Sequence, residues 1–310
     1  MCSGLFTGQA DRVRTRAGRG TGTRDGESGG NADTAVRVRG LVKRYGERLA
    51  VDGLDLDIFP GEVFALLGPN GAGKTTTVEI LEGYRRRDEG EVSVIGADPA
   101  HGDLAWRARI GIVLQSTAET AELTVAELIH HFAGYYPDPR DPDDVIVSVG
   151  LEDKRDARTR SLSGGQRRRL DVALGIVGNP RLLFLDEPTT GFDPQARRSF
   201  WDLVRALRGD GTTILLTTHY LDEAQALADR VGVIDKGRLL AVDTPDRLGG
   251  RLAHRARVRW HDDDGDHEEI TDTPTRLVTE LGDRYGGEVP QLQVIRPSLE
   301  DVYLGMLEES

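Results

Sequence analysis

The chain has 310 residues, of which 38% are hydrophobic, and at about 150 residues per domain it is long enough for two domains with full cores. The 40 Lys and Arg residues against 52 Asp and Glu residues give a net charge of -12, which argues against a wholly basic nucleic-acid-binding protein, and no nucleic-acid partner is expected. The single cysteine, Cys2, excludes an intrachain disulfide and a metal site built from several cysteines.

The first 34 residues are predicted to be a disordered tail. They contain eight Gly, five Arg and four acidic residues, with Val13 as the one large apolar residue after Phe6. Such a composition buries too little apolar surface to offset the entropy of ordering. A basic arm is the alternative, but its net charge is only +1. The longest apolar runs of the chain fall far short of the roughly 18 residues that a bilayer span needs, so any membrane role is expected to come through a partner.

Two different strand patterns follow the tail. Apolar residues alternate with Asp55 and Asp57 over residues 54–58, which is typical of a half-exposed strand, and residues 36–41 are expected to form its antiparallel neighbour. Four later runs, at residues 63–67, 110–114, 182–185 and 214–216, are continuously apolar and are separated by segments long enough for helices. Continuous runs of this kind are typical of a parallel sheet that is buried on both faces, so the fold class is α/β.

Helix boundaries are marked between these runs. Thr124-x-x-Glu127 forms a capping-box pattern that opens a helix, and Gly178 and Pro180 end another one.

The composition of the chain changes near Gly250. Residues 251–310 carry 7 basic and 14 acidic residues, which suggests a separate acidic accessory unit with a hairpin, a helix, a short strand at 292–295 and a last helix. The predicted organisation is therefore a tail (1–34), a main domain (35–250) and an accessory domain (251–310).

The most specific motif is the string Gly68 to Thr75, which matches G-x-x-x-x-G-K-[ST] between a buried strand and a helix. Its glycines let successive N–H groups face inward, and the start of the helix adds its positive dipole end, so the loop is suited to a polyphosphate. Lys74 supplies a point charge, and Thr75 offers a hydroxyl to Mg²⁺. The alternative is a glycine-rich turn without a ligand. The nucleotide-binding residues predicted here are Gly68, Pro69, Asn70, Gly71, Ala72, Gly73, Lys74, Thr75 and Thr76.

Two carboxylates, Asp186 and Glu187, follow the buried run at 182–185. They lie at the carboxyl end of a strand, where ligands bind in open α/β sheets. Mg²⁺ held through Asp186 would supply the counter-charge, and Glu187 is then placed to orient or deprotonate a water. An ordinary strand-end turn accounts for Pro188 but not for two acids. Gln115 and His219 end two other predicted strands and should reach the same edge, although each alone would be interpreted as a surface amide or a solvated histidine.

The string Leu162-Ser163-Gly164-Gly165-Gln166 resembles the signature motif of the ABC ATPase family, although Ser163-x-x-Gln166 is also an ordinary capping box. Combined with the motifs above in the same order, it identifies residues 35 to about 245 as similar to a complete ABC nucleotide-binding domain. The resemblance implies a P-loop NTPase core of ABC type with an antiparallel β subdomain, a helical subdomain that carries the signature, and a small α+β C-terminal accessory unit.

The same resemblance implies a role for each motif. Lys74 and Thr75 match the Walker A motif, Gln115 the Q-loop with a contact to Mg²⁺, and Asp186 and Glu187 the Walker B motif. Ser163, Gly164, Gly165 and Gln166 match the signature, Asp193 the D-loop, His219 the switch histidine, and Tyr45 the aromatic residue that stacks on adenine, although an aromatic residue near a strand is usually part of the core. The implied cofactors are ATP and Mg²⁺, and the implied catalytic residues are Glu187, His219, Gln115 and Lys74.

Two further strings, at 218–224 and 297–304, resemble bacterial multidrug exporter ATPases of the daunorubicin-resistance type. That resemblance implies a head-to-tail dimer with a second copy and a separate transmembrane permease at the cytoplasmic face of the membrane. It also implies efflux of a drug or another hydrophobic small molecule, with residues 116–123 bordering the groove for a permease helix. A soluble ABC ATPase of DNA repair or translation is the alternative. The absence of a coiled-coil insertion and the single phosphate loop argue against it, and no Asn-Lys-x-Asp motif supports a GTPase.

Overall fold

The computed structural model describes residues 34–113, 122–248, 255–262 and 264–309. The predicted tail up to residue 33, Gln115 and most of the segment 116–123 lie outside these residues, so the structure does not test them. Within the described residues, helices separate the continuously apolar strands from one another, as the sequence predicted.

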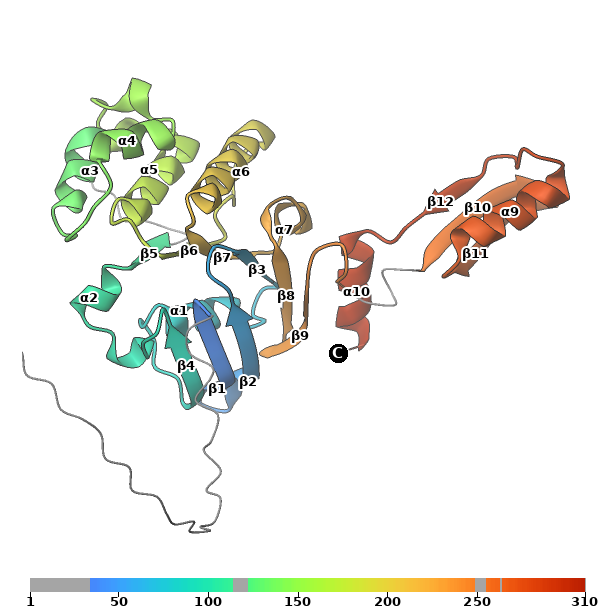
Figure 1. Ribbon diagram of the computed structural model, residues 1–310, viewed down its shortest axis with the longest axis horizontal. Helices are drawn as coiled ribbons and strands as arrows, with labels where there is room; N and C mark the ends of the chain where they lie inside the picture. The colour runs from blue at the N-terminus through green and yellow to red at the C-terminus, as the bar shows by residue number, and fades with distance from the viewer. Residues whose placement is uncertain (1–33, 114–121, 249–254, 263, 310) are drawn as a thin grey trace, which may run out of the picture. The chain divides into compact units, whose positions relative to one another are not determined.

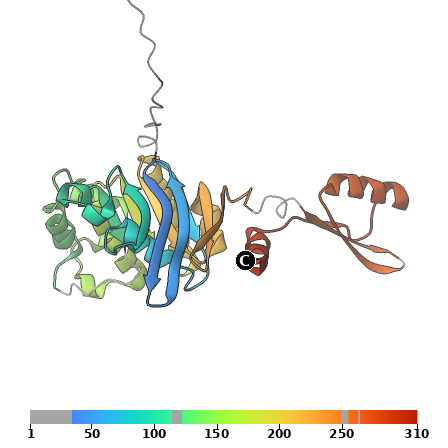
Figure 2. The same ribbon diagram turned by 90° about the horizontal axis from the view of Figure 1, so that it is seen from below.

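A three-stranded antiparallel sheet opens the fold (Figures 1 and 2). It consists of β1 (Val36–Tyr45), β2 (Arg48–Ile58) and β4 (Glu89–Val94), with β1 in the centre. Val38 lies opposite Leu56, so the predicted antiparallel pairing of these two segments is confirmed.

A six-stranded sheet forms the centre of the fold, in the order β5-β6-β7-β3-β8-β9. Its strands are β3 (Val63–Leu67), β5 (Ile110–Val113), β6 (Leu182–Asp186), β7 (Thr213–Thr218), β8 (Arg230–Asp235) and β9 (Arg238–Asp243). All neighbours are parallel except β8 and β9, which pair antiparallel. The parallel sheet predicted from the continuous apolar runs is therefore confirmed, with an antiparallel edge strand that the runs did not reveal.

Both faces of this sheet are covered by apolar residues. Val63, Ala65 and Leu67 of β3 belong to a core shared with the helices, whereas Phe64 and Leu66 belong to a second core shared with β1 and β2. Successive side chains on a strand point to opposite faces, so a strand between two cores must be apolar at every position. This is the physical reason that the central runs do not alternate, whereas β2 does.

The helices of the main domain are α1 (Lys74–Leu81), α2 (Leu104–Arg107), α3 (Val125–Ala133), α4 (Pro142–Ser148), α5 (Gly164–Ile176), α6 (Pro194–Gly209) and α7 (Leu221–Leu227). Thr124 and Glu127 form the predicted capping box, with reciprocal side-chain to backbone hydrogen bonds of 3.2 and 2.8 Å. The helices α3, α4 and α5 lie together (Figure 1) and contact one another, which confirms a helical subdomain that carries the start of α5. No helix in the described part of the chain is both long and apolar enough to span a bilayer.

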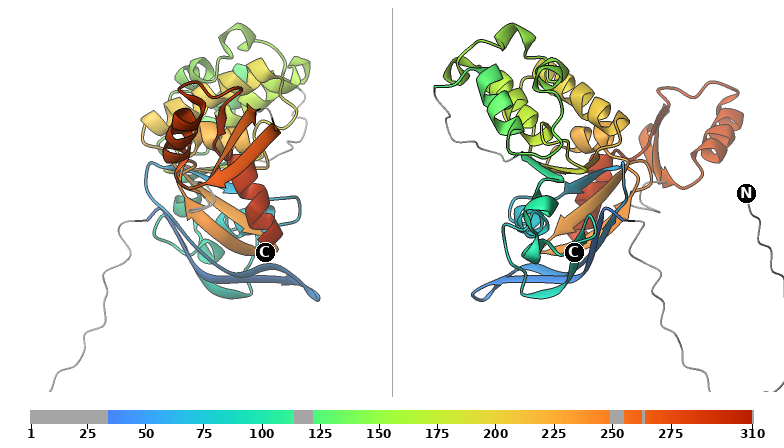
Figure 3. Two further views of the ribbon diagram at one scale, coloured as in Figure 1. Left: turned by 90° about the vertical axis from the view of Figure 1, so that its right-hand side faces the viewer. Right: turned by 60° about the vertical axis from the view of Figure 1, so that its left-hand side comes forward.

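The C-terminal region contains the predicted hairpin, helix, strand and final helix (Figure 3). The strands β10 (Ala256–Asp262), β11 (Gly265–Thr271) and β12 (Gln293–Ile295) form an antiparallel sheet in the order β11-β10-β12. Its own small core joins Val258 to Leu281 of α9 (Pro274–Tyr285). The last helix, α10 (Leu299–Glu309), instead contributes Leu299 to the core that contains α7. The boundary at residue 250 stays a prediction.

A polar cluster in this region predicts a pH dependence of stability. The Tyr285 hydroxyl donates to Asp262 Oδ2 at 2.5 Å, and His267 Nε2 lies 2.7 Å from Asp262 Oδ1. These hydrogen bonds lower the pKa of Asp262 from 3.8 to about 2. Since the folded pKa lies below the unfolded value, the stabilisation is complete above pH 3.8 and is lost as the pH falls towards about 2.

The measurement compares the chain with its Asp262→Asn variant by unfolding at each pH. Tryptophan fluorescence is suitable because Trp260 stacks on His267 with ring centroids 5.2 Å apart, and Trp260→Phe identifies its share of the signal. The stability difference between the two chains is expected to disappear as the pH falls through this window. A difference of constant size would show that the Asp262 carboxylate does not carry the effect.

Candidate functional site

The phosphate loop connects β3 to α1, and close packing fixes its glycines. A Cβ atom on Gly68 would lie 2.3 Å from the Ile234 carbonyl oxygen, and one on Gly73 would lie 2.5 Å from the Ala50 carbonyl oxygen. Gly73 also has a φ of 109°, which residues with a side chain rarely adopt. Any side chain at these positions would push the loop off β2 and β8 and would change the direction of its N–H groups.

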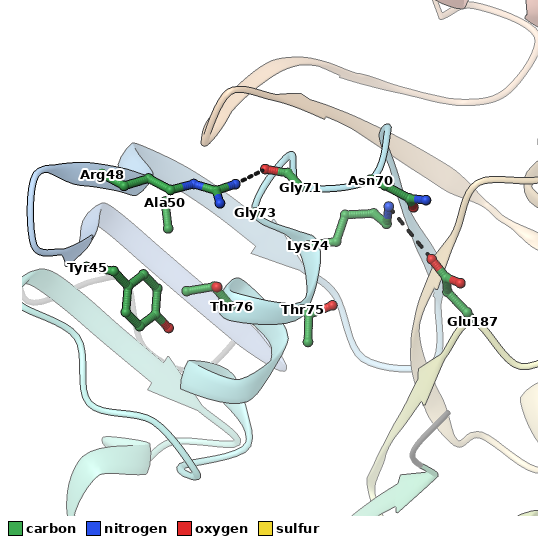
Figure 4. A pocket seen from close by; sticks show the side chains of 10 residues that line it. All are labelled: Tyr45, Arg48, Ala50, Asn70, Gly71, Gly73, Lys74, Thr75, Thr76 and Glu187. Carbon is green, nitrogen blue, oxygen red and sulfur yellow. Dashed lines mark hydrogen bonds and ion pairs between the residues drawn. The ribbon is translucent and has the colours of Figure 1, made fainter. Parts of the chain in front are cut away.

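The loop lines a pocket of about 270 Å³ at the start of α1 (Figure 4). The pocket combines residues of the loop, of the β1–β2 turn and of the end of β6: Tyr45, Arg48, Ala50, Asn70, Gly71, Gly73, Lys74, Thr75, Thr76 and Glu187. Six of them were predicted from the motif, and Tyr45 and Glu187 from other parts of the chain. The structure therefore brings together residues that are more than a hundred positions apart.

Lys74 is the buried cation of this pocket, with 5% of its surface exposed. Its Nζ donates to the Gly68 carbonyl at 2.7 Å and to the Pro69 carbonyl at 3.2 Å, and it lies 3.9 Å from Glu187 Oε1. Burial lowers the pKa of Lys74, and the negative charges of Glu187 and Asp186 act in the opposite direction. The positive charge is therefore held between the loop and the carboxylates, where a polyphosphate would meet it.

Asp186 ends β6, and Glu187 follows it. The neighbouring strand β7 contributes Thr217, which lies opposite Asp186. Its hydroxyl donates to Asp186 Oδ1 at 2.5 Å and accepts from the Glu187 N–H at 3.0 Å. His219 Nδ1 lies 3.4 Å from Glu187 Oε1, so the two carboxylates and the histidine share one edge of the sheet, as the sequence predicted.

Glu187 has an unusual backbone conformation, with a φ of 42° in the left-handed region. A residue with a side chain in this region costs on the order of 1–3 kcal/mol and persists only where the surroundings hold it. Hydrogen bonds from the Glu187 N–H to Thr217 and from the Thr190 N–H to the Glu187 carbonyl, at 3.3 Å, contribute to holding it. The turn aims the carboxylate at Lys74 (Figure 4).

Tyr45 ends β1 with 41% of its surface exposed, so it is not a core residue. Lys43 Nζ and the Arg85 guanidinium lie 5.7 and 5.2 Å from the centre of its ring. An exposed aromatic face beside the loop is suited to stacking against a nucleobase. Arg48 donates to the Gly71 carbonyl at 3.3 Å and was not predicted from the sequence, because no motif places a β-hairpin residue beside the loop.

The signature residues lie apart from this pocket. Ser163 caps α5, where its hydroxyl accepts from the Gln166 N–H at 3.3 Å and the Gln166 side chain accepts from the Ser163 N–H at 3.0 Å. Asp193 caps α6 and accepts from the N–H groups of Gln195 and Ala196. Neither Asp193 nor the run Ser163 to Gln166 lines the pocket of the described chain.

Comparisons with known proteins identify the family. Residues 51–190 match the family model described as ABC transporter. Over 223 residues, covering 70% of each chain, the protein is 46% identical to the daunorubicin resistance ATP-binding protein DrrA3 of Streptomyces coeruleorubidus. The chain belongs to the ABC transporter ATP-binding family. The resemblance found in the motifs is thereby confirmed, and this ABC protein is an ATPase.

Other relatives extend the match. The ABC ATPase is 42% identical to the daunorubicin resistance ATP-binding protein DrrA2 of Streptomyces coeruleorubidus, over 87% of this chain and 94% of the relative. It is 45% identical to the Nod factor export ATP-binding protein I of Ralstonia nicotianae, over 69% and 68% of the two chains. Among solved structures, CbiO1 of Clostridium perfringens, part of an ABC transporter complex, is 29% identical with a TM-score of 0.64, over 70% of this chain and 90% of that one.

Proposed function

We propose that two copies of this ABC ATPase bind two molecules of MgATP and drive a separate permease that exports a drug or another hydrophobic small molecule. The observation that carries the proposal is the match to a daunorubicin resistance ATP-binding protein over 87% of this chain and 94% of that relative's length. ATP hydrolysis would take place at the cytoplasmic face of the membrane, where the permease would bind the ATPase.

The nucleotide would lie along the pocket from Tyr45 to Glu187. Its adenine would stack on the exposed Tyr45 ring, and its phosphates would accept hydrogen bonds from the N–H groups of residues 68–76 and from Lys74. No cluster of three or more His, Cys, Asp or Glu side chains in the described residues could hold a metal alone. This fits Mg²⁺, which would take the Thr75 hydroxyl, Asp186 and Gln115 together with phosphate oxygens and water, and would draw charge from the transferred phosphoryl group.

The hydrolytic step would use Glu187 and His219. As the water oxygen bonds to the γ-phosphorus, the bond to the bridging oxygen breaks with its electron pair on ADP, and a water proton passes to Glu187. His219, 3.4 Å from that carboxylate, would orient it and contact the released phosphate. Lys74 would stabilise the charge that develops on the phosphate oxygens.

The exposed signature supports a head-to-tail dimer. Ser163 is exposed, and its hydroxyl accepts a hydrogen bond from the Gln166 N–H, which leaves the hydroxyl proton available to donate to an external acceptor. Since these residues do not line the pocket of their own chain, they would cap the γ-phosphate held by the second copy. Asp193, at the start of α6, would lie at the same interface.

Mixing two inactive variants tests the composite site. A Lys74→Ala chain keeps its signature, and a Ser163→Arg chain keeps its phosphate loop, so the mixed dimer has one site with both defects and one intact site. We expect about a quarter of normal turnover per chain in an equal mixture, because half of random dimers are mixed and each has one intact site of two. Each variant alone is the control. No recovery, with mixed dimers shown by crosslinking, would contradict the head-to-tail arrangement.

Export is tested by co-expression with a candidate permease from the same locus. Cells with both proteins should accumulate less daunorubicin than cells with the permease and a Glu187→Gln chain, and the ATPase should move to the membrane fraction. If the chain stays in the soluble fraction whenever the permease is present, the alternative of a soluble ABC ATPase is supported instead.

A further inference from the structure

Arg168, a buried residue of the helix that begins with the signature, donates hydrogen bonds to the backbone on both sides of Glu187. Arg168 lies on α5 with 7% of its surface exposed. Its Nη2 donates to the Asp186 carbonyl at 3.0 Å, and its Nε donates to the Pro188 carbonyl at 3.0 Å. One planar guanidinium therefore holds the carbonyl groups of the two residues that flank Glu187.

The contact to the Asp186 carbonyl holds the peptide unit next to the strained φ of Glu187. The carbonyl of Asp186 and the N–H of Glu187 belong to one planar peptide unit, which Arg168 holds at one end and Thr217 at the other. The Pro188 carbonyl fixes the next part of the turn. With both sides fixed, Glu187 stays at its positive φ of 42° and its carboxylate stays near Lys74.

The charge of Arg168 is balanced from other directions. Asp171, one turn further along α5, lies 4.0 Å from its Nη1. Burial lowers the pKa of Arg168, and the negative charges of Asp171, Asp186 and Glu223 oppose that effect. Glu223 of α7 is itself fully buried, so charge balance offers a second reason for a cation here, and the experiment must separate it from backbone positioning.

We propose that Arg168 is a positioning residue for hydrolysis, which holds the turn at Glu187 in its productive conformation and ties it to the helix that begins with the signature. The inference rests on the proposed role of Glu187. It also gives the signature a direct mechanical connection to the catalytic carboxylate of its own chain, because Ser163 and Arg168 lie on adjacent turns of the same helix end.

Arg168→Met keeps the apolar stem and removes the donors. We expect kcat to fall by about 10- to 100-fold, as small misplacements of reacting groups do, while the affinity for ATP stays within about twofold. Arg168→Lys keeps the charge but not the two-point donation, and it should recover little of the lost kcat. Arg169→Met is the matched control, since Arg169 also donates to two backbone carbonyls, those of Val149 and Gly150, away from the site.

Combining Arg168→Met with Glu187→Gln distinguishes a role through Glu187 from a general role in the stability of the fold. If Arg168 acts through Glu187, Arg168→Met should change the residual single-turnover rate of Glu187→Gln by less than about threefold. Additive losses in the double variant, full recovery by lysine, or a parallel loss of ATP binding would overturn the proposal. If Arg168→Met does not fold, the same comparison is made with Arg168→Lys, alone and combined with Glu187→Gln. Normal turnover of Glu187→Gln alone would instead refute the proposed role of Glu187.

Discussion

Glu187→Gln should bind ATP at least as tightly as the unmodified chain does and hydrolyse it about 10² to 10⁴ times more slowly. The amide preserves the shape of the side chain, but it cannot take the proton of the attacking water. The residues proposed to hold the nucleotide, Tyr45 and the phosphate loop, are unchanged in this variant. Removal of a negative charge 3.9 Å from Lys74 should also favour the bound polyphosphate.

Phosphate release in the steady state and nucleotide titration measure the two effects separately. Glu127→Gln is the matched control, because it makes the same chemical change in the capping box of α3, which does not line the pocket. Its turnover should be normal. Near-normal turnover of Glu187→Gln would remove Glu187 from the catalytic step, and a loss of ATP binding would show that the side chain supports the loop instead.

Lys74→Ala is expected to weaken ATP binding by about 10- to 100-fold, which is the range for the loss of a charged hydrogen bond. The same change leaves the Gly68 and Pro69 carbonyls without their donor, so the loop itself should become less ordered. Because Lys74 faces the phosphates in the proposed complex, the loss should be large for ATP and small for AMP.

Calorimetric titration with ATP, ADP and AMP distinguishes these cases. Lys154→Ala is a suitable control, since Lys154 lies on a short 3-10 helix (Glu152–Lys154) and does not line the pocket. Equal losses for all three nucleotides would mean that the variant perturbs the whole pocket, and the specific role of Lys74 in phosphate binding would then be wrong.

The site was predictable from the sequence where its chemistry is local. A phosphate loop needs consecutive N–H groups and a helix start, so the pattern that predicts one is contained within the eight residues from Gly68 to Thr75. The acids after the 182–185 run were also local, because carboxylates at the carboxyl end of a fully buried strand need a nearby cation or ligand to offset their charge. The antiparallel sheet and the parallel sheet could also be predicted, because the hydrophobic pattern of each strand is a local feature of the sequence.

Three further contacts depend on the order of strands and helices in space. Thr217 meets Asp186 because β7 pairs with β6, and Arg168 meets the same turn because α5 packs against it. Arg48 reaches Gly71 across the β1–β2 turn. No spacing along the chain indicates these neighbours, since each pair is brought together by tertiary packing. The packing of α10 into the core that contains α7 could not be predicted from the sequence for the same reason.

The left-handed backbone conformation of Glu187 also means that selection for stability and selection for activity favour different residues at this position. Glycine adopts a φ of 42° without the penalty that glutamate bears, so a chain with Glu187→Gly should gain on the order of 1 kcal/mol from the backbone while it loses the carboxylate proposed to act in hydrolysis. Selection for stability alone would therefore drift towards inactive chains at this position. A screen that rewards only heat resistance or yield will accumulate such chains, whereas one that also demands ATP turnover will keep the strained acid.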